Sequence, residues 1–303
     1  MSNLIIQAEN LHKQFQQTQV LTGLDLEINA GQVVGLLGTN GSGKTTFIKC
    51  ILGLLKASSG TSSIFGQNSW DLDESAKAHL GYVSQDSALL PWMTVQSLTE
   101  YTGAFYAQWD QAYVNSLLKA WNLNETQRVG ALSTGQRQKL SVILALGHHP
   151  ELLVLDEPVA SLDPVARRQF LQSLIEFTED EDNTILFSTH ITSDLERVAS
   201  HVAFLDAGKL GFFGELDTLI HQVKRIRITA GQDLPHSLKL PGTLRSEING
   251  NHALLAVKEF DVATLENLSH QFQATTTVED LNLEEIFLEL SGVSSQTEVE
   301  TIQ

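Results

Sequence analysis

The sequence has a single cysteine, few basic residues and no long apolar run. Cys50 is the only cysteine among 303 residues, which excludes an intrachain disulfide and a cysteine-based zinc site and fits a reducing compartment. Apolar runs stay shorter than the roughly 18 residues that a membrane-spanning helix needs, so any membrane contact must go through another protein. Residues 1–4 lack a basic region followed by an apolar stretch, so we expect no secretory signal and a cytoplasmic location.

The shortage of basic residues also limits the class of partner. There are 19 Lys and Arg residues against 36 Asp and Glu residues, which gives a net charge of −17. Such a field repels polyanions, so we expect no nucleic-acid partner, although a local pocket can still bind a nucleotide. Hydrophobic residues make up 42% of the chain, enough for a substantial core.

Most of the chain has an α/β pattern. From Leu4 to about Gly214 short apolar segments alternate with amphipathic ones, which predicts a mainly parallel sheet flanked by helices. The segment Ile5–Ile28 instead favours an N-terminal antiparallel β subdomain with a turn near residues 16–19. We expect a helical subdomain over about 86–135, with most of the following aromatic residues in its core: Trp92, Tyr101, Phe105, Tyr106, Trp109 and Trp121.

The pattern changes after His221. We therefore predict a main domain over 1–221, a small C-terminal α+β domain over 222–290 and a disordered polar tail over 291–303. In the small domain, strands are expected at Arg225–Thr229 and Leu254–Val257, and helices at Val262–Phe272 and Leu283–Leu290.

A glycine-rich loop follows the apolar segment Val33–Leu37. Residues 38–45 match G-x-x-x-x-G-K-[ST] and precede a helix predicted from Lys44 to about Leu55. Glycines let backbone N–H groups approach phosphate oxygens, Lys44 supplies a positive charge, and the Thr45 hydroxyl can ligate Mg²⁺. A glycine-rich turn without a ligand is the alternative, which the strand–loop–helix context disfavours. We predict a P-loop NTPase core whose nucleotide site contains Gly38, Asn40, Gly41, Ser42, Gly43, Lys44, Thr45 and Thr46.

Two acids and a histidine follow two further apolar strands. Leu152–Leu155 runs into Asp156 and Glu157, and Thr184–Ser188 leads to His190. Beside a phosphate loop, Asp156 would hold Mg²⁺ through water and Glu157 could act as general base. Taken alone, a polar turn after a buried strand explains the acids equally well, and a structural hydrogen bond explains His190 better. Its catalytic alternative is a hydrogen bond to the γ-phosphate and to Glu157.

The segment Leu132–Gln136, with the sequence Leu-Ser-Thr-Gly-Gln, resembles the signature motif of ABC-type ATPases. The family usually has glycine at the position of Thr134. Ser133 and Gln136 also satisfy a capping box for a helix that runs to about Leu146. The resemblance implies that Ser133, Thr134, Gly135 and Gln136 face the γ-phosphate bound by a partner subunit.

Three further positions match the family in order. Gln85 resembles the glutamine that senses Mg²⁺ and links to the helical subdomain. Ser161-Leu162-Asp163 resembles the loop that crosses the dimer interface, with a helix expected to begin near Pro164. Phe15 stands where the family stacks an aromatic ring on adenine; a role in the strand core is the alternative. The resemblance extends over residues 4 to about 221.

The resemblance implies a Mg²⁺-dependent ATPase subunit of an ABC transporter, with ATP bound between two copies that close head to tail, as a homodimer or a heterodimer. It implies separate integral-membrane permease subunits and a position on the cytoplasmic face of the inner membrane. Glu157, His190 and Gln85 would be catalytic, and Thr45, Gln85 and Asp156 would hold the metal, Asp156 through water. The C-terminal segment Val278–Phe287 is similar to that of bacterial ABC-2-type exporter ATPases, which implies export.

Two alternatives belong to other classes. A soluble ABC-type ATPase acting on ribosomes or DNA would carry two ATPase units or a long coiled-coil insertion, whereas this chain has one glycine loop and an acidic balance. A regulatory module that binds ATP without hydrolysing it is disfavoured because Glu157 and His190 are both present.

Overall fold

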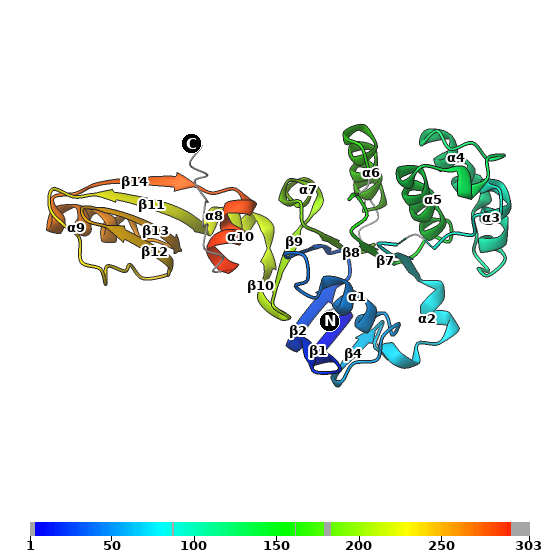
Figure 1. Ribbon diagram of the computed structural model, residues 1–303, viewed down its shortest axis with the longest axis horizontal. Coiled ribbons are helices and arrows are strands. Elements are labelled where there is room, and N and C mark those ends of the chain that lie inside the picture. Colours follow the sequence, from blue (N-terminus) through cyan, green and yellow to red (C-terminus); the bar gives the residue numbers. More distant parts are fainter. Residues whose placement is uncertain (1–3, 87, 161, 179–182, 292–303) are drawn as a thin grey trace, which may run out of the picture. The chain divides into compact units, whose positions relative to one another are not determined.

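A mainly parallel sheet forms the centre of the first of two units (Figure 1). The computed structural model describes residues 4–86, 88–160, 162–178 and 183–291, and the chain divides into the compact units Met1–Phe213 and Gly214–Gln303. The strand order in this sheet is β10-β9-β3-β8-β7-β6, and β3, β6, β7, β8 and β9 run parallel. The bounds are β3 (Val33–Leu37), β6 (Leu80–Val83), β7 (Leu152–Asp156), β8 (Thr184–Thr189), β9 (His201–Asp206) and β10 (Lys209–Glu215). The predicted fold class is confirmed.

The strands that carry the site are buried throughout. Every residue of β3, β7 and β8 is buried, as expected for parallel strands covered on both faces. Parallel strands present their carboxyl ends at one edge of the sheet. The glycine loop after β3, the acid pair after β7 and His190 after β8 therefore meet there.

A second, antiparallel sheet belongs to the same unit, with the strand order β2-β1-β4-β5. Its strands are β1 (Leu4–Phe15), β2 (Thr18–Asn29), β4 (Ser59–Ile64) and β5 (Gln67–Asn68). β1 and β2 pair from Leu4↔Asn29 to Phe15↔Thr18, so the predicted hairpin is confirmed and its turn is shorter than expected.

Helix α1 (Lys44–Ile51) packs between these two sheets. Its buried residues share one core with β1, β2 and β4 and with one face of the central sheet. The predicted extension to Leu55 is wrong. Gly53 adopts a φ of +67°, which ends the helix, and the amides of Leu54 and Leu55 turn back to the carbonyl oxygen of Lys49.

The helical segment lies to one side of the central sheet, where α3, α4 and α5 lie together (Figure 1). Its helices are α3 (Val95–Gly103), α4 (Gln111–Ala120), the short η2 (Val129–Ala131) and α5 (Thr134–Leu146), and η1 (Ser69–Asp71) and α2 (Glu74–Ala78) precede it. The expected aromatic core is wrong for half of its members. Trp121 is buried, whereas Trp92, Tyr101 and Phe105 are 67%, 49% and 71% exposed. Leucines and valines of α3, α4 and α5 build the core instead.

Two helices follow the acid pair and His190. α6 (Pro164–Phe177) begins at Pro164 as predicted, and α7 (Thr192–Val198) follows β8. Leu195 of α7 is fully buried against Gly35 of β3, where a Cβ atom would collide with its side chain. No helix in the described part of the chain is long and apolar enough to span a membrane.

The second unit is a four-stranded antiparallel sheet with helices, in the strand order β12-β13-β11-β14. Its elements are α8 (Leu216–Gln222), β11 (Val223–Thr229), β12 (Thr243–Asn249), β13 (His252–Lys258), α9 (Val262–Phe272), β14 (Thr275–Asp280) and α10 (Leu283–Ser291). The division after Phe213 assigns α8 to this unit, whereas the boundary predicted after residue 221 left most of it in the first. The predicted tail lies almost wholly outside the described residues.

Candidate nucleotide site

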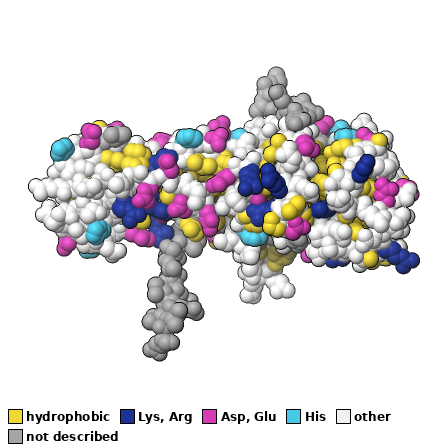
Figure 2. Space-filling view, turned by 90° about the horizontal axis from the view of Figure 1, so that it is seen from above, with side chains coloured by type: hydrophobic (Ala, Val, Ile, Leu, Met, Phe, Trp, Pro, Cys, Tyr) yellow, Lys and Arg dark blue, Asp and Glu magenta, His cyan; other side chains and the backbone are white. Residues whose placement is uncertain are grey.

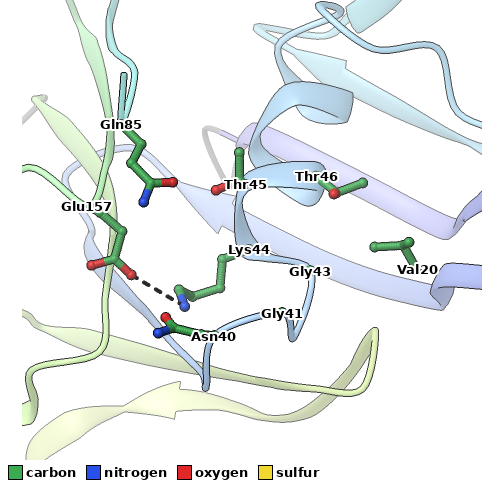
Figure 3. Close-up of a pocket in the computed structure, with 9 residues that line it drawn as sticks. All are labelled: Val20, Asn40, Gly41, Gly43, Lys44, Thr45, Thr46, Gln85 and Glu157. Atoms are coloured by element: carbon green, nitrogen blue, oxygen red, sulfur yellow. Dashed lines mark ion pairs between the residues drawn. The ribbon is translucent and has the colours of Figure 1, made fainter. Parts of the chain in front are cut away.

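A cavity of about 420 Å³ lies at the carboxyl edge of the central sheet. Figure 3 shows Lys44 and Glu157 pointing toward one another across it, with Val20 on the opposite side of the loop from Glu157. The residues that line it are Val20, Asn40, Gly41, Gly43, Lys44, Thr45, Thr46, Gln85 and Glu157. Eight of these nine were predicted as site residues; Val20, from β2, was not.

The glycine loop leaves the start of α1 open to an anion. Gly43 is the N-cap of α1 with a φ of +108°, and no side chain caps the helix. The first amides of an α-helix have no partner within the helix, so they can donate to phosphate oxygens. Gly38 is required for a different reason, because a Cβ atom there would collide with the carbonyl oxygen of Leu205.

Lys44 is held in the site by three oxygens. Its ammonium donates to the carbonyl oxygens of Gly38 at 2.8 Å and Thr39 at 3.3 Å, and lies 3.4 Å from Oε1 of Glu157. The side chains of Lys44 and Glu157 are each 6% exposed. A buried ion pair of this kind needs further hydrogen bonds to offset the loss of hydration, and the two carbonyl groups supply them.

Glu157 joins Lys44 to His190. Its other carboxylate oxygen, Oε2, lies 2.9 Å from Nδ1 of His190, so the predicted hydrogen bond between these side chains is present. Glu157 adopts a φ of +51°, in the left-handed region that is unfavourable for a side chain other than glycine. The sharp turn after β7 therefore sends the two adjacent acids in different directions.

Asp156 lies at the end of β7, where it is fully buried. Its Oδ1 accepts a hydrogen bond from the Ser188 hydroxyl at 2.7 Å, and its Oδ2 has no hydrogen-bond partner among the described residues. Burial, followed by the charge of Asp156, raises the pKa of Tyr82 to about 12, so that phenol stays neutral beside the carboxylate. A buried carboxylate oxygen without a partner, at the same sheet edge as the cavity that Thr45 and Gln85 line, fits a hydrated Mg²⁺ ion.

Ser188 is a site residue that sequence reasoning missed. Its hydroxyl donates to Asp156 and accepts the backbone N–H of Glu157 at 2.9 Å, so one buried group orients both acids. The sequence offered one signal for Ser188. It stands two residues before His190, on the predicted strand that follows the strand of Asp156 along the chain. Strand order, which the sequence does not state, decides that β7 and β8 are neighbours.

The remaining predicted residues lie outside this cavity. Ser133 caps α5, and both hydrogen bonds of the predicted capping box with Gln136 are present. Thr134 lines a neighbouring cavity of about 400 Å³ with Gln85 and Glu157, and its hydroxyl accepts a hydrogen bond from Arg137.

Asp163 caps α6 by accepting from the amides of Val165 and Ala166, which hold the pKa of its carboxyl below the usual value. Ser161 lies outside the described residues. Phe15 does not line the cavity of about 420 Å³: its ring is 44% exposed and lies beneath the Lys13 ammonium. This exposure also contradicts the alternative role in the strand core.

The arrangement defines a nucleoside-triphosphate hydrolase. The loop and Lys44 can hold phosphates, Asp156 can hold a metal ion, and a carboxylate oriented by a histidine can receive a proton from water. Among the described residues, no group of three or more histidine, cysteine and acidic side chains could hold a metal ion by itself.

Comparison with known proteins identifies the class more closely. Residues 21–160 match the family model described as ABC transporter. The chain is 30% identical over 230 residues to the ABC transporter ATP-binding protein YtrB of Bacillus subtilis (strain 168), covering 76% of this chain and 78% of that protein. It is 32% identical over 301 residues to the Nod factor export ATP-binding protein I of Cupriavidus metallidurans (strain ATCC 43123 / DSM 2839 / NBRC 102507 / CH34), covering 95% and 97%.

A solved structure of the ATP-binding subunit of an ABC transporter is similar as well, with a TM-score of 0.66 and 27% identity over 72% of this chain and 92% of that chain. The chain belongs to the family of ABC transporter ATP-binding proteins, and it is an ATPase subunit of that class. The transporter prediction is thereby supported over the alternative of a soluble ATPase acting on ribosomes or DNA.

Lys44→Ala tests the phosphate site. A hydrogen bond to a charged group contributes about 1.5–3 kcal/mol, so removal of the ammonium should weaken ATP binding by about tenfold or more. Equilibrium binding of a fluorescent ATP analogue measures this directly. Lys49→Ala, in the last turn of the same helix, is the matched control and should bind normally. Equal affinity of the Lys44 variant and the wild type would contradict the assignment of the loop.

Ser188→Ala tests the orientation of the two acids. Misplacement of a catalytic group by about 1 Å can lower a rate on the order of 100-fold, so we expect kcat to fall between about 10- and 100-fold while the KM for ATP changes little. The free energy of unfolding should also fall by about 1–3 kcal/mol, because two buried polar groups lose their partner. Ser173→Ala, which removes a helix-surface hydroxyl, is the control. An unchanged kcat would show that Asp156 and Glu157 are oriented without Ser188.

Proposed function

We propose that this chain converts ATP hydrolysis into export by a separate membrane permease. The observation that carries the proposal is the buried carboxylate of Glu157, which contacts both the phosphate-loop lysine and a histidine. This carboxylate is placed to polarise a water molecule against the γ-phosphate. His190 would orient the Glu157 carboxylate through their hydrogen bond, and the positive charge of Lys44 would attract the phosphates.

The cavity orients a nucleotide from end to end. The start of α1 and Lys44 would attract the phosphates. The apolar side chain of Val20, in β2 of the β1–β2 hairpin, lies at the other end of the cavity. The base would therefore lie along this hairpin, which also carries Phe15 at the end of β1. An exposed phenylalanine ring offers a face for stacking on adenine.

The metal site of the proposal consists of Thr45, Gln85 and Asp156. Thr45 and Gln85 line the cavity, and the free Oδ2 of Asp156 would accept from water around the ion. Mg²⁺, when bound, neutralises charge on the phosphate oxygens. The Ser188 hydroxyl donates to Asp156 Oδ1, so Oδ2 is the oxygen of this carboxylate that would serve the metal.

The second half of the site would come from another copy of the chain. The Ser133–Gln136 segment lies at the start of α5, where the amides and the serine hydroxyl suit an anion. Asp163, which caps α6, would meet the partner together with the predicted loop residue Ser161. A homodimer is proposed; a heterodimer with a related ATPase subunit would use the same surfaces.

Export is inferred from the relatives. The Nod factor export protein aligns with 95% of this chain, which includes the second unit as well as the ATPase unit. The chain would then act at the cytoplasmic face of the inner membrane, bound there through its permease.

The surface for the permease is proposed on the helical segment. A cavity of about 250 Å³ is lined there by residues of β6, α3 and α5 and of the segments that follow or precede them, the latter including Leu89, Tyr106 and His148. Trp92, Tyr101 and Phe105 are exposed on this segment, and the rings of Tyr101 and Phe105 pack edge to face. Exposed aromatic groups beside a hollow are typical of a protein interface. A cytoplasmic helix of the permease fits this surface.

The mixed distribution of surface charges and the negative net charge favour a protein partner over a nucleic acid. Acidic and basic side chains are interspersed on the face shown in Figure 2, and the chain carries a net charge of −17. A polyanion would need a concentrated basic surface.

Glu157→Gln tests the general base and the dimer together. The amide keeps the size of the side chain but accepts no proton, so hydrolysis should fall about 10²–10⁴-fold. ATP binding should persist, and the variant should form a dimer that is stable in Mg²⁺-ATP. Size-exclusion chromatography with and without ATP measures the dimer, and phosphate release measures hydrolysis. Hydrolysis at the wild-type rate would remove Glu157 from the role of general base.

Phe105→Asp tests the permease surface. Placing a charge on an exposed aromatic position should lower the recovery of a polytopic membrane protein with the tagged chain at least about tenfold, because interface hot spots contribute 2 kcal/mol or more. ATP binding should be unchanged. Trp70→Asp replaces another exposed aromatic, 51% exposed against 71% for Phe105, outside the helical segment and serves as control. Equal recovery of the membrane protein by both variants would place the interface elsewhere.

A further inference from the structure

Arg167 forms a partly buried ion pair with Asp194, outside the nucleotide cavity. Its Nε and Nη2 atoms lie 2.7 Å and 2.6 Å from the same oxygen, Oδ1 of Asp194, and Nη2 also lies 3.4 Å from the Ser193 hydroxyl. The Asp194 side chain is 2% exposed, and its Oδ2 has no hydrogen-bond partner among the described residues. Arg167 is therefore the principal compensation for a buried charge.

The two ends of this ion pair lie on elements that lead to functional positions. Arg167 is in the first turn of α6, and its amide donates to the carbonyl oxygen of Asp163, the residue that caps the helix. Asp194 is in the first turn of α7, four residues after His190. The pair thus connects the loop proposed to cross the dimer interface with the segment that carries His190.

His190 depends on such anchors for its position. Its side chain is 48% exposed, so packing around the ring does not confine it. Its contact with Glu157 is a single hydrogen bond of 2.9 Å. The segment after it is held by Leu195, packed against Gly35, and by Asp194, bound to Arg167. The contact of Leu195 with Gly35 holds α7 against the sheet. The ion pair of Arg167 with Asp194 holds the first turn of α7 against the first turn of α6.

We propose that Arg167 is a positioning residue that couples the dimer loop to His190. With the ion pair intact, a displacement of the start of α6 by the partner subunit moves the start of α7 and changes the contact between His190 and Glu157. Hydrolysis in one site would then depend on engagement of the loop beside it. This inference rests on the proposed function, since it requires the dimer, and it adds a residue through which the dimer acts on the catalytic histidine.

The test compares two neighbouring arginines of α6. Arg167→Met removes the charge and keeps a long side chain, and Arg168→Met is the matched control at an exposed position. We expect Arg167→Met to lower kcat about 10- to 100-fold, as for a misplaced catalytic group, with the KM for ATP within about threefold of wild type. Arg168→Met should retain the wild-type kcat. Arg167→Lys, which restores one positive charge toward Asp194, should recover part of the rate.

Stability needs a separate control because Arg167→Met leaves Asp194 charged and buried. The double variant Arg167→Met/Asp194→Asn removes both charges and should fold normally while remaining slow. A rate loss that disappears in this double variant would show that the ion pair serves stability alone, and the proposal would be wrong. The same conclusion follows if the kcat values of the Arg167 and Arg168 variants are equal.

A double-mutant cycle with His190→Ala tests the proposed path directly. If Arg167 acts through His190, Arg167→Met should lower the single-turnover rate by less than about twofold in the His190→Ala background, because coupled residues are not additive. A full additional loss would overturn the proposal. ATP-dependent dimerisation of Glu157→Gln separates the two hypotheses: absence of that dimer contradicts the proposed function, whereas a dimer with additive Arg167 and His190 effects contradicts only this inference.

Discussion

The rest of the site depends on two contacts of the buried Glu157 carboxylate. One is its ion pair with Lys44, and the other is its hydrogen bond with His190. A lone carboxylate would lose its hydration at such a place, and a lone ammonium would do the same, so neither is stable without the other. Carbonyl oxygens of the glycine loop complete the surroundings of the lysine. The same pair suits the proposed chemistry, because an ammonium that could bind phosphates and a carboxylate that could accept a proton from water lie within one cavity. Phosphate oxygens would compete with Glu157 for the ammonium, which links nucleotide binding to the freedom of the base.

The central sheet makes this contact possible. Lys44, Glu157 and His190 follow β3, β7 and β8, which are far apart along the chain but lie in the order β3-β8-β7. A left-handed backbone at Glu157 and a hydroxyl from Ser188 then separate the roles of the two adjacent acids. Asp156 keeps one oxygen without a partner for a hydrated metal, while Glu157 turns toward the lysine and the histidine. One strand end thus supplies two acids with different surroundings, which suits the different tasks proposed for them.

Parts of the first unit outside the nucleotide cavity have features that suit the proposed contacts with other subunits. α5 begins at a capping box, where the proposal places an anion, and α6 begins at the Asp163 cap. The helical segment keeps three large aromatic side chains at its surface rather than in its core. Arg167 and Asp194 join the helices that follow the acid pair and His190. These features agree with an ATPase whose chemistry depends on a second copy and whose work is done by a separate permease.

The sequence by itself determined the phosphate loop, the acid pair, the capping box and the mainly parallel fold, because each depends on residues close together in the chain. Short spacing fixes local backbone geometry, and uninterrupted apolar segments indicate buried strands. Only the tertiary structure decided that Ser188 binds both acids, that Val20 lines the cavity, and that Trp92, Tyr101 and Phe105 face outward while leucines and valines form the helical core. Strand order and the side on which a helix packs depend on contacts between distant segments. Those contacts leave no periodic signal in the segments themselves. The sequence therefore predicts candidate catalytic groups but not the residues that contact and orient them.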